Sequence, residues 1–172
     1  MHSLQVRRLL SAIAVLIGTC LLPALFCVAQ ATIPAHKEGT VTQVANGPFD
    51  VKITPQDDKS DDPLLSRLLL DKQYHGDLDA IGIGQMLTAG TGVKGSGAYV
   101  AIEKVSGSLK GRKGTFILQH TGIMTQNKPE LSINVVPDSG TGDLTGLSGK
   151  MKINIAPDGK HSYELQYTLN TN

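Results

Sequence analysis

Short stretches that alternate between apolar and polar residues recur along the chain after about residue 98. In residues 161–169, His, Tyr and Leu occupy every second position, and Ser, Glu, Gln and Thr lie between them. Residues 131–135 and 151–155 alternate in the same way, and in residues 115–121 Phe116, Leu118 and His120 share one face. Successive side chains of a strand point to opposite sides, so these runs predict antiparallel strands with one buried face.

Glycine and proline turns separate these strands. The sequence Pro157-Asp158-Gly159-Lys160 predicts a tight turn, because glycine readily adopts a positive φ. A Gly-x-Leu pattern recurs from Gly76, Gly107 and Gly142, about one hairpin apart, and indicates bends that let a sheet curl. The leucine-dense segment 63–70 fits either a short helix or a strand. We therefore expect an all-β fold, a closed antiparallel barrel of about eight strands, with a β-sandwich as the alternative.

The amino terminus reads as a targeting segment. Arg7 and Arg8 precede an apolar run over residues 9–28, and Ala29-Gln30-Ala31 follows. This order is typical of a secretory signal peptide cleaved after Ala31, with an uncleaved membrane anchor as the alternative because the run is long. We expect an exported protein, periplasmic or secreted, without stable membrane insertion after cleavage. The predicted domains are a signal peptide (1–31), an N-terminal extension or first edge strand (32–46) and the β-barrel (47–172).

Charge and cysteine content limit the partners. The chain of 172 residues has 16 basic and 15 acidic residues, a net charge of +1, which argues against nucleic acid as a partner. Cys20 and Cys27 both precede the cleavage site, so the mature chain has no disulfide or thiolate metal site. Few aromatic rings remain for stacking sugars or bases. No histidine pair has a zinc-binding spacing, and we expect no metal site.

Three motifs match the sequence patterns of known sites, but their surroundings in the chain do not fit those sites. Gly90–Gly95 fits G-x-G-x-x-G, yet it leads into a strand rather than a helix, so we interpret it as a hairpin loop and expect no cofactor. Asp138-Ser139-Gly140 has no second copy to supply a catalytic carboxylate pair, and it reads as a turn. The acidic segment 57–62 lacks the EF-hand frame and reads as a solvated loop.

The inward faces carry the most informative candidates. Glu103 shares a face with Tyr99, and His120 and His161 also alternate with apolar residues. Glu103 and His120 are the candidate acid–base pair, because burial tunes such groups toward neutrality. The expected ligand-binding residues are Tyr99, Glu103, Phe116, His120, His161, Tyr163 and Tyr167.

Structural roles are the alternatives for the same residues. His120 and His161 would then lie near strand ends at the barrel rim, bonded to loop carbonyls. Glu103 would pair with a neighbouring Lys or His, and the tyrosines would belong to the core.

Several segments together resemble one bacterial family, DUF3224, a domain of unknown function. The segments are Tyr99–Glu103, Gly107–Gly122, Val135–Gly149 and His161–Tyr163. The resemblance is strong over residues 99–169 and weaker over 49–87. It implies a small β-barrel related in shape to allene oxide cyclase and loosely to lipocalins, and it implies no settled activity.

Three functions fit this barrel. The first is the binding of a small, mostly apolar molecule in or at the mouth of the barrel. The second is a cofactor-free isomerase or cyclase resembling allene oxide cyclase, with Glu103 and His120 as acid and base. The third is a structural envelope protein with a filled barrel. The volume of the lumen separates the third from the others, and the sequence leaves enzyme activity and oligomeric state open.

Overall fold

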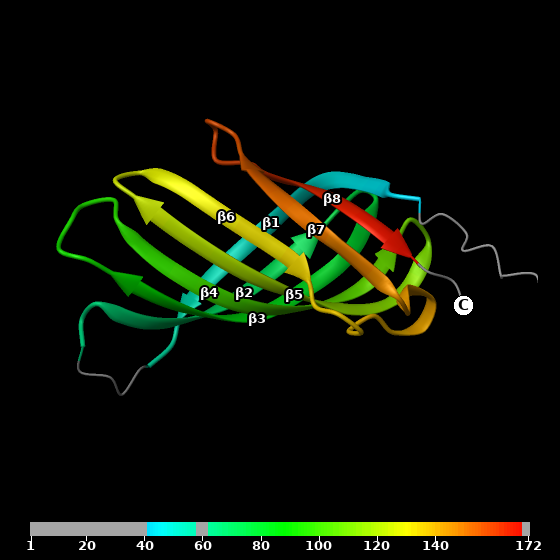
Figure 1. Ribbon diagram of the computed structural model, residues 1–172, viewed down its shortest axis with the longest axis horizontal. Helices are drawn as coiled ribbons and strands as arrows, with labels where there is room; N and C mark the ends of the chain where they lie inside the picture. The colour runs from blue at the N-terminus through cyan, green and yellow to red at the C-terminus, as the bar shows by residue number, and fades with distance from the viewer. Residues whose placement is uncertain (1–40, 58–61, 170–172) are drawn as a thin grey trace, which may run out of the picture. The chain divides into compact units, whose positions relative to one another are not determined.

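The computed structural model describes residues 41–57 and 62–169, which form one closed antiparallel barrel of eight strands (Figure 1). Each strand pairs with the next along the chain, and β1 pairs with β8 to close the barrel. The barrel prediction is therefore confirmed over the sandwich. The strands are β1 (Gln43–Pro55), β2 (Leu65–Tyr74), β3 (Leu78–Gly90), β4 (Gly97–Leu109), β5 (Arg112–Thr125), β6 (Lys128–Val135), β7 (Leu147–Ile155) and β8 (His161–Leu169).

The alternation of faces seen in the sequence is the alternation of the barrel wall. In β5, Phe116, Leu118 and His120 are all buried, and in β8 Tyr163 and Leu165 are buried. The leucine-dense segment belongs to β2 from Leu65 onward and is a strand, not a helix. Period-two patterning thus placed the inward faces correctly.

The turns also match their predicted types. Residues 156–160 connect β7 to β8, with Gly159 at φ +83°. Residues 91–96 form the loop between β3 and β4, and Asp138 lies in a turn after β6 with φ +59°. β1 begins at Gln43, so residues 43–46 of the expected extension pair with β8 and are part of the barrel.

The leader predicted at 1–31, the rest of the extension up to residue 40, and residues 58–61 of the acidic segment lie outside the described residues. Among the residues that are described, no helix has the length and hydropathy needed to cross a bilayer.

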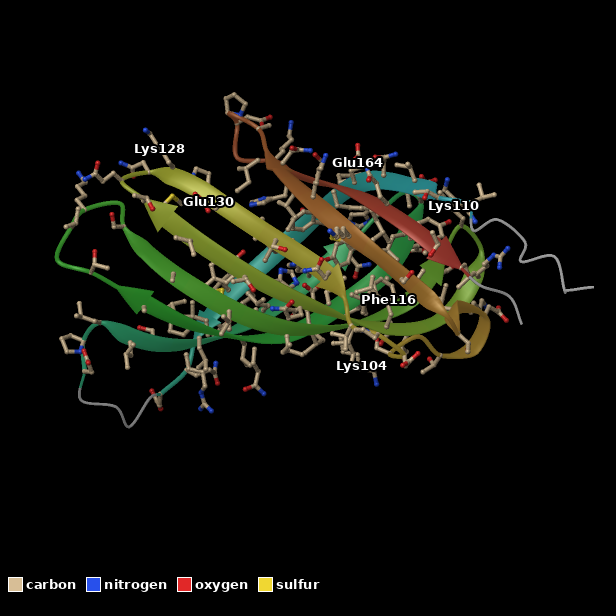
Figure 2. All side chains as sticks on the ribbon, in the orientation of Figure 1. Lys104, Lys110, Phe116, Lys128, Glu130 and Glu164 are labelled. Carbon is tan, nitrogen blue, oxygen red and sulfur yellow. The ribbon has the colours of Figure 1, made fainter. Side chains whose placement is uncertain are left out.

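The interior divides into a packed half and a hollow half. The packed half holds the main apolar cluster, which includes Tyr74, Leu118 and Tyr163. Its end is covered by the connection between β6 and β7, whose 3-10 helix η1 (Gly142–Leu144) buries Leu144. The hollow half lies at the opposite end, where a smaller cluster of Leu70, Met86 and Ala101 lines the wall. Figure 2 shows Lys128 and Glu130 at the hollow end and Lys110 at the packed end.

The barrel wall is joined unevenly around its circumference. β7 and β8 pair along their whole length, from Leu147–Leu169 to Ile155–His161. Between β6 and β7, the described residues form two pairs, Ile133–Met151 and Asn134–Lys150. The two strands diverge toward the hollow end (Figure 1). We call this the β6–β7 seam, defined by residues 128–132 and 152–155.

Candidate functional site

A cavity of about 460 Å³ occupies the hollow half and opens at the end of the barrel. This volume lies within the range of small-molecule sites, roughly 300–1,000 Å³. Most of its lining is apolar and comes from inward positions of the strands. The apolar side chains include Phe49, Val51, Leu70, Met86, Leu131 and Ile153, and the polar ones are Lys72, Thr88, Tyr99, His120, Glu130 and His161.

Beneath the cavity lies a buried polar cluster of Lys72, Tyr74, Glu103 and His120. Lys72 Nζ lies 2.6 Å from Glu103 Oε2 and donates to it, and the Tyr74 hydroxyl donates to Glu103 Oε1 at 2.8 Å. Lys72 Nζ also donates to the Tyr74 oxygen at 3.2 Å. His120 Nε2 lies 3.1 Å from Glu103 Oε2. Glu103 is 0% exposed, so its charge is held by these contacts rather than by water.

The cluster occupies the boundary between the two halves. In β2, Lys72 is the inward residue between Leu70 of the hollow half and Tyr74 of the packed half. In β4, Glu103 holds the same place between Ala101 and Val105. Because inward positions recur every second residue, three strands place one polar side chain each at one level of the lumen.

Glycines in β3 make room for the ion pair. β3 lies between β2 and β4, and its Gly82 pairs with Lys72 while Gly84 pairs with Glu103. A Cβ atom on Gly82 would overlap the Glu103 carboxylate and crowd the Tyr74 ring. The missing side chains therefore let Lys72 and Glu103 meet across an intervening strand.

The cluster keeps Glu103 ionised. Burial by itself raises the pKa of Glu103, but the contacts with His120 and Lys72 outweigh it and hold the pKa below its usual value. Burial, followed by the neighbouring Glu103 charge, raises the pKa of Tyr74 well above its ordinary value. Glu103 is thus an anchored carboxylate, poorly suited to take up a proton.

His120 is held less completely than its neighbours. It is 2% exposed, and its Nε2 lies 3.1 Å from Glu103 Oε2 without forming a regular hydrogen bond to it. Among the described residues, Nε2 is a buried side-chain nitrogen without a hydrogen-bond partner. His120 lies well within β5 and not at a strand end, so it does not lie at the barrel rim, where its alternative structural role would place it.

The predicted site residues separate into two groups. Tyr99, His120 and His161 line the cavity, and Glu103 lies directly beneath it in contact with His120. His161 is the first residue of β8, and its ring packs against Phe49 with centroids 5.1 Å apart.

Phe116, Tyr163 and Tyr167 lie in the packed half instead. The Tyr163 hydroxyl donates to the His75 carbonyl at 3.0 Å and accepts from the Leu78 amide at 2.8 Å. The Tyr167 hydroxyl donates to Gln43 Oε1 at 3.0 Å. These three residues support the barrel and do not line the cavity.

Sequence reasoning missed Lys72 and Tyr74. The available signal was Lys72 itself, a lysine at an inward position between Leu70 and Tyr74, which predicts a buried counter-charge. Within residues 41–57 and 62–169, no three His, Cys, Asp or Glu side chains are placed to hold a metal ion.

The comparisons with known proteins agree with the barrel. Residues 45–167 match the model of the family described as "Protein of unknown function (DUF3224)". A crystal structure at 1.84 Å of a DUF3224 protein with unknown function, from Shewanella oneidensis MR-1, is similar with a TM-score of 0.73 and 46% identity. The match covers 77% of this chain and 100% of that one. No curated protein matches the chain.

Proposed function

The chain belongs to the DUF3224 family, and from its cavity we propose that it binds a small, mostly apolar molecule in the hollow half of the barrel. Because the amino terminus has the pattern of a secretory leader, we also propose that this binding protein is exported. Family membership adds the fold and no activity.

The main support for the proposal is the contrast between the packed and hollow halves of the lumen. The packed half shows that this barrel is narrow enough to be filled by its own side chains. The hollow half is not filled by side chains, and Ile155 and Leu131 on its inward face are 66% and 43% exposed. A bound apolar molecule would cover these side chains and remove their contact with water.

One observation favours the isomerase alternative. Glu103 and His120 converge to 3.1 Å beside the cavity, as an acid–base pair requires. However, both Glu103 oxygens already accept hydrogen bonds from Lys72 and Tyr74. Because a saturated, ionised carboxylate is a weak base, we rank binding above catalysis.

A matched pair of tryptophan variants tests the proposal. Met86 lines the cavity, whereas its neighbour Leu87 points outward and is 56% exposed. The chain contains no tryptophan, so each variant carries a unique fluorophore. Met86→Trp should fill part of the cavity, and Leu87→Trp should leave it unchanged.

The measurement is native mass spectrometry of the protein isolated from cells, followed by titration with a fluorescent apolar probe. We expect a co-purifying small molecule and saturable probe binding in wild type and Leu87→Trp, and at least about tenfold weaker probe binding in Met86→Trp. Probe binding that is equal in both variants, or absent from wild type, would contradict the proposal.

A further inference from the structure

At the floor of the cavity, the hydrogen-bond donors of the cluster face the cavity, whereas its carboxylate acceptor does not. Lys72 and His120 line the cavity, but Glu103 and Tyr74 do not. Glu103, the acceptor of the cluster, is 0% exposed and lies behind them. Glu130, the carboxylate that does line the cavity, belongs to β6 at the hollow end. A molecule that reaches the floor therefore meets hydrogen-bond donors there and not the Glu103 carboxylate.

One N–H bond of the Lys72 ammonium group is not used in a hydrogen bond. An ammonium group carries three N–H bonds, and the structure uses two of them, toward Glu103 Oε2 and the Tyr74 oxygen. The Phe49 ring lies 5.4 Å from Nζ and offers a π face rather than a hydrogen-bond acceptor of comparable strength. The third N–H has no acceptor among the described side chains.

His120 supplies a second unsatisfied group at the same level. Its Nε2 is buried and without a hydrogen-bond partner in the described part of the chain. A buried polar atom left in this state lowers the stability of a protein. An acceptor atom held at the cavity floor would satisfy it and the spare Lys72 N–H together.

The charges at the cavity floor disfavour a cationic head group at that position. Glu103 neutralises Lys72, so the positive charge of Lys72 does not require an anionic ligand. An amine head group would nevertheless meet the Lys72 ammonium first, because the Glu103 carboxylate lies behind it. The walls above the floor are largely apolar, and they suit an aliphatic body.

We infer that the cavity takes an amphipathic molecule polar end first, with a carbonyl or carboxylate oxygen accepting from Lys72 and His120 and an aliphatic chain toward the mouth. This inference rests on the proposed function and specifies its ligand class.

The test compares head groups on one alkyl chain. The full-length protein is titrated by calorimetry with 2-decanone, decanoate and decylamine. We expect the ketone and the carboxylate to bind at least about tenfold more tightly than the amine, the ratio that one hydrogen bond to a charged donor supports. The imidazole NMR signals of His120 should also shift with 2-decanone and not with decylamine.

Variants assign the preference to the cluster. The double variant Lys72→Met/Glu103→Leu removes both charges and should bind the three probes within about twofold of one another. Lys104→Met is the matched control, because Lys104 is exposed and points away from the barrel (Figure 2), and it should keep the wild-type ratio.

The wild-type titration separates the two proposals without relying on a variant that folds. Equal affinity for all three probes, or tighter binding of the amine, would overturn the inference and leave the binding function standing. A loss of head-group preference in Lys104→Met would also overturn it. Failure of every probe to bind would overturn the binding function itself.

Discussion

The packed and hollow halves of the lumen are built from the same eight strands with the same alternation of faces. In the packed half, the inward positions carry large side chains, among them Tyr74, Phe116 and Tyr163. In the hollow half, Ala101 occupies an inward position with a small side chain, and the Tyr99 ring lies against the inward position of Gly122. The strand pattern decides which side chains point inward, and their volumes decide whether space remains.

The ends of the two halves are also closed differently. At the packed end, the long β6–β7 connection buries Leu144 across the opening. At the hollow end, the described residues of the connections (56–57, 62–64, 91–96, 126–127 and 156–160) include no buried side chain. The cavity therefore coincides with small inward residues, with connections whose described residues are not buried, and with an incompletely paired wall.

The largest effect is expected at the boundary between the halves. Lys72→Met leaves the Glu103 carboxylate buried without its cation, which should lower the free energy of unfolding by about 3–5 kcal/mol. Lys72→Met/Glu103→Leu removes both charges and should recover most of this loss. Urea unfolding followed by circular dichroism measures both. A double variant as unstable as the single one would attribute the loss to packing rather than charge.

The two halves should respond differently to the same truncation. Leu118→Ala opens a void in the packed half and should cost about 2–4 kcal/mol. Leu70→Ala removes the same atoms beside an existing cavity, and we expect a loss of about 1–2 kcal/mol, because fewer packing contacts disappear. Denaturant midpoints of the two variants make the comparison. Equal losses would mean that the hollow half is packed in solution.

A glycine pair in β3 tests how the cluster is accommodated. Gly82→Ala places a methyl group on the Glu103 carboxylate and should destabilise the protein by about 2 kcal/mol. Gly90→Ala, in the same strand, meets its nearest atom at 3.7 Å and should change stability by less than about 0.5 kcal/mol. Thermal unfolding of both variants is the measurement. Similar stability of the two would show that Glu103 moves aside at little cost.

Much of the wall could be predicted from local pattern. The alternation in residues 115–121 and 161–169 places Phe116, His120 and Tyr163 inward because a strand has a period of two. The same pattern contains no information on depth along the strand. For that reason Phe116 and Tyr163, both inward as expected, belong to the packed half and not to the cavity.

The cluster itself depends on contacts that local pattern does not contain. The sequence predicts a Lys or His partner for Glu103 if it does not act in catalysis, and the structure pairs it with Lys72 and His120. Lys72 is 31 residues away and lies two strands away across Gly82. Identifying it requires the register of three strands, which the open choice of helix or strand for residues 63–70 left undetermined.

The smallest expected effect concerns the β6–β7 seam. Backbone groups of successive strand residues alternate between the two neighbouring strands. Ile133 pairs with Met151 across the seam, and Leu131, two residues earlier, has its backbone groups on the same side but no pair in the described β7. The Leu131 amide should therefore exchange with deuterium roughly tenfold faster than the Ile133 amide.

Ile153 and Met151 in β7 form the matching comparison, with Ile153 the faster. Hydrogen exchange followed by NMR resolves all four amides without any substitution. Because these positions differ in pairing while sharing strands and facing direction, the ratio reports the opening of the wall directly. If Leu131 and Ile153 were as protected as Ile133 and Met151, the seam would be closed in solution. The hollow half would then open through its mouth alone, and a ligand would have to enter along the barrel axis.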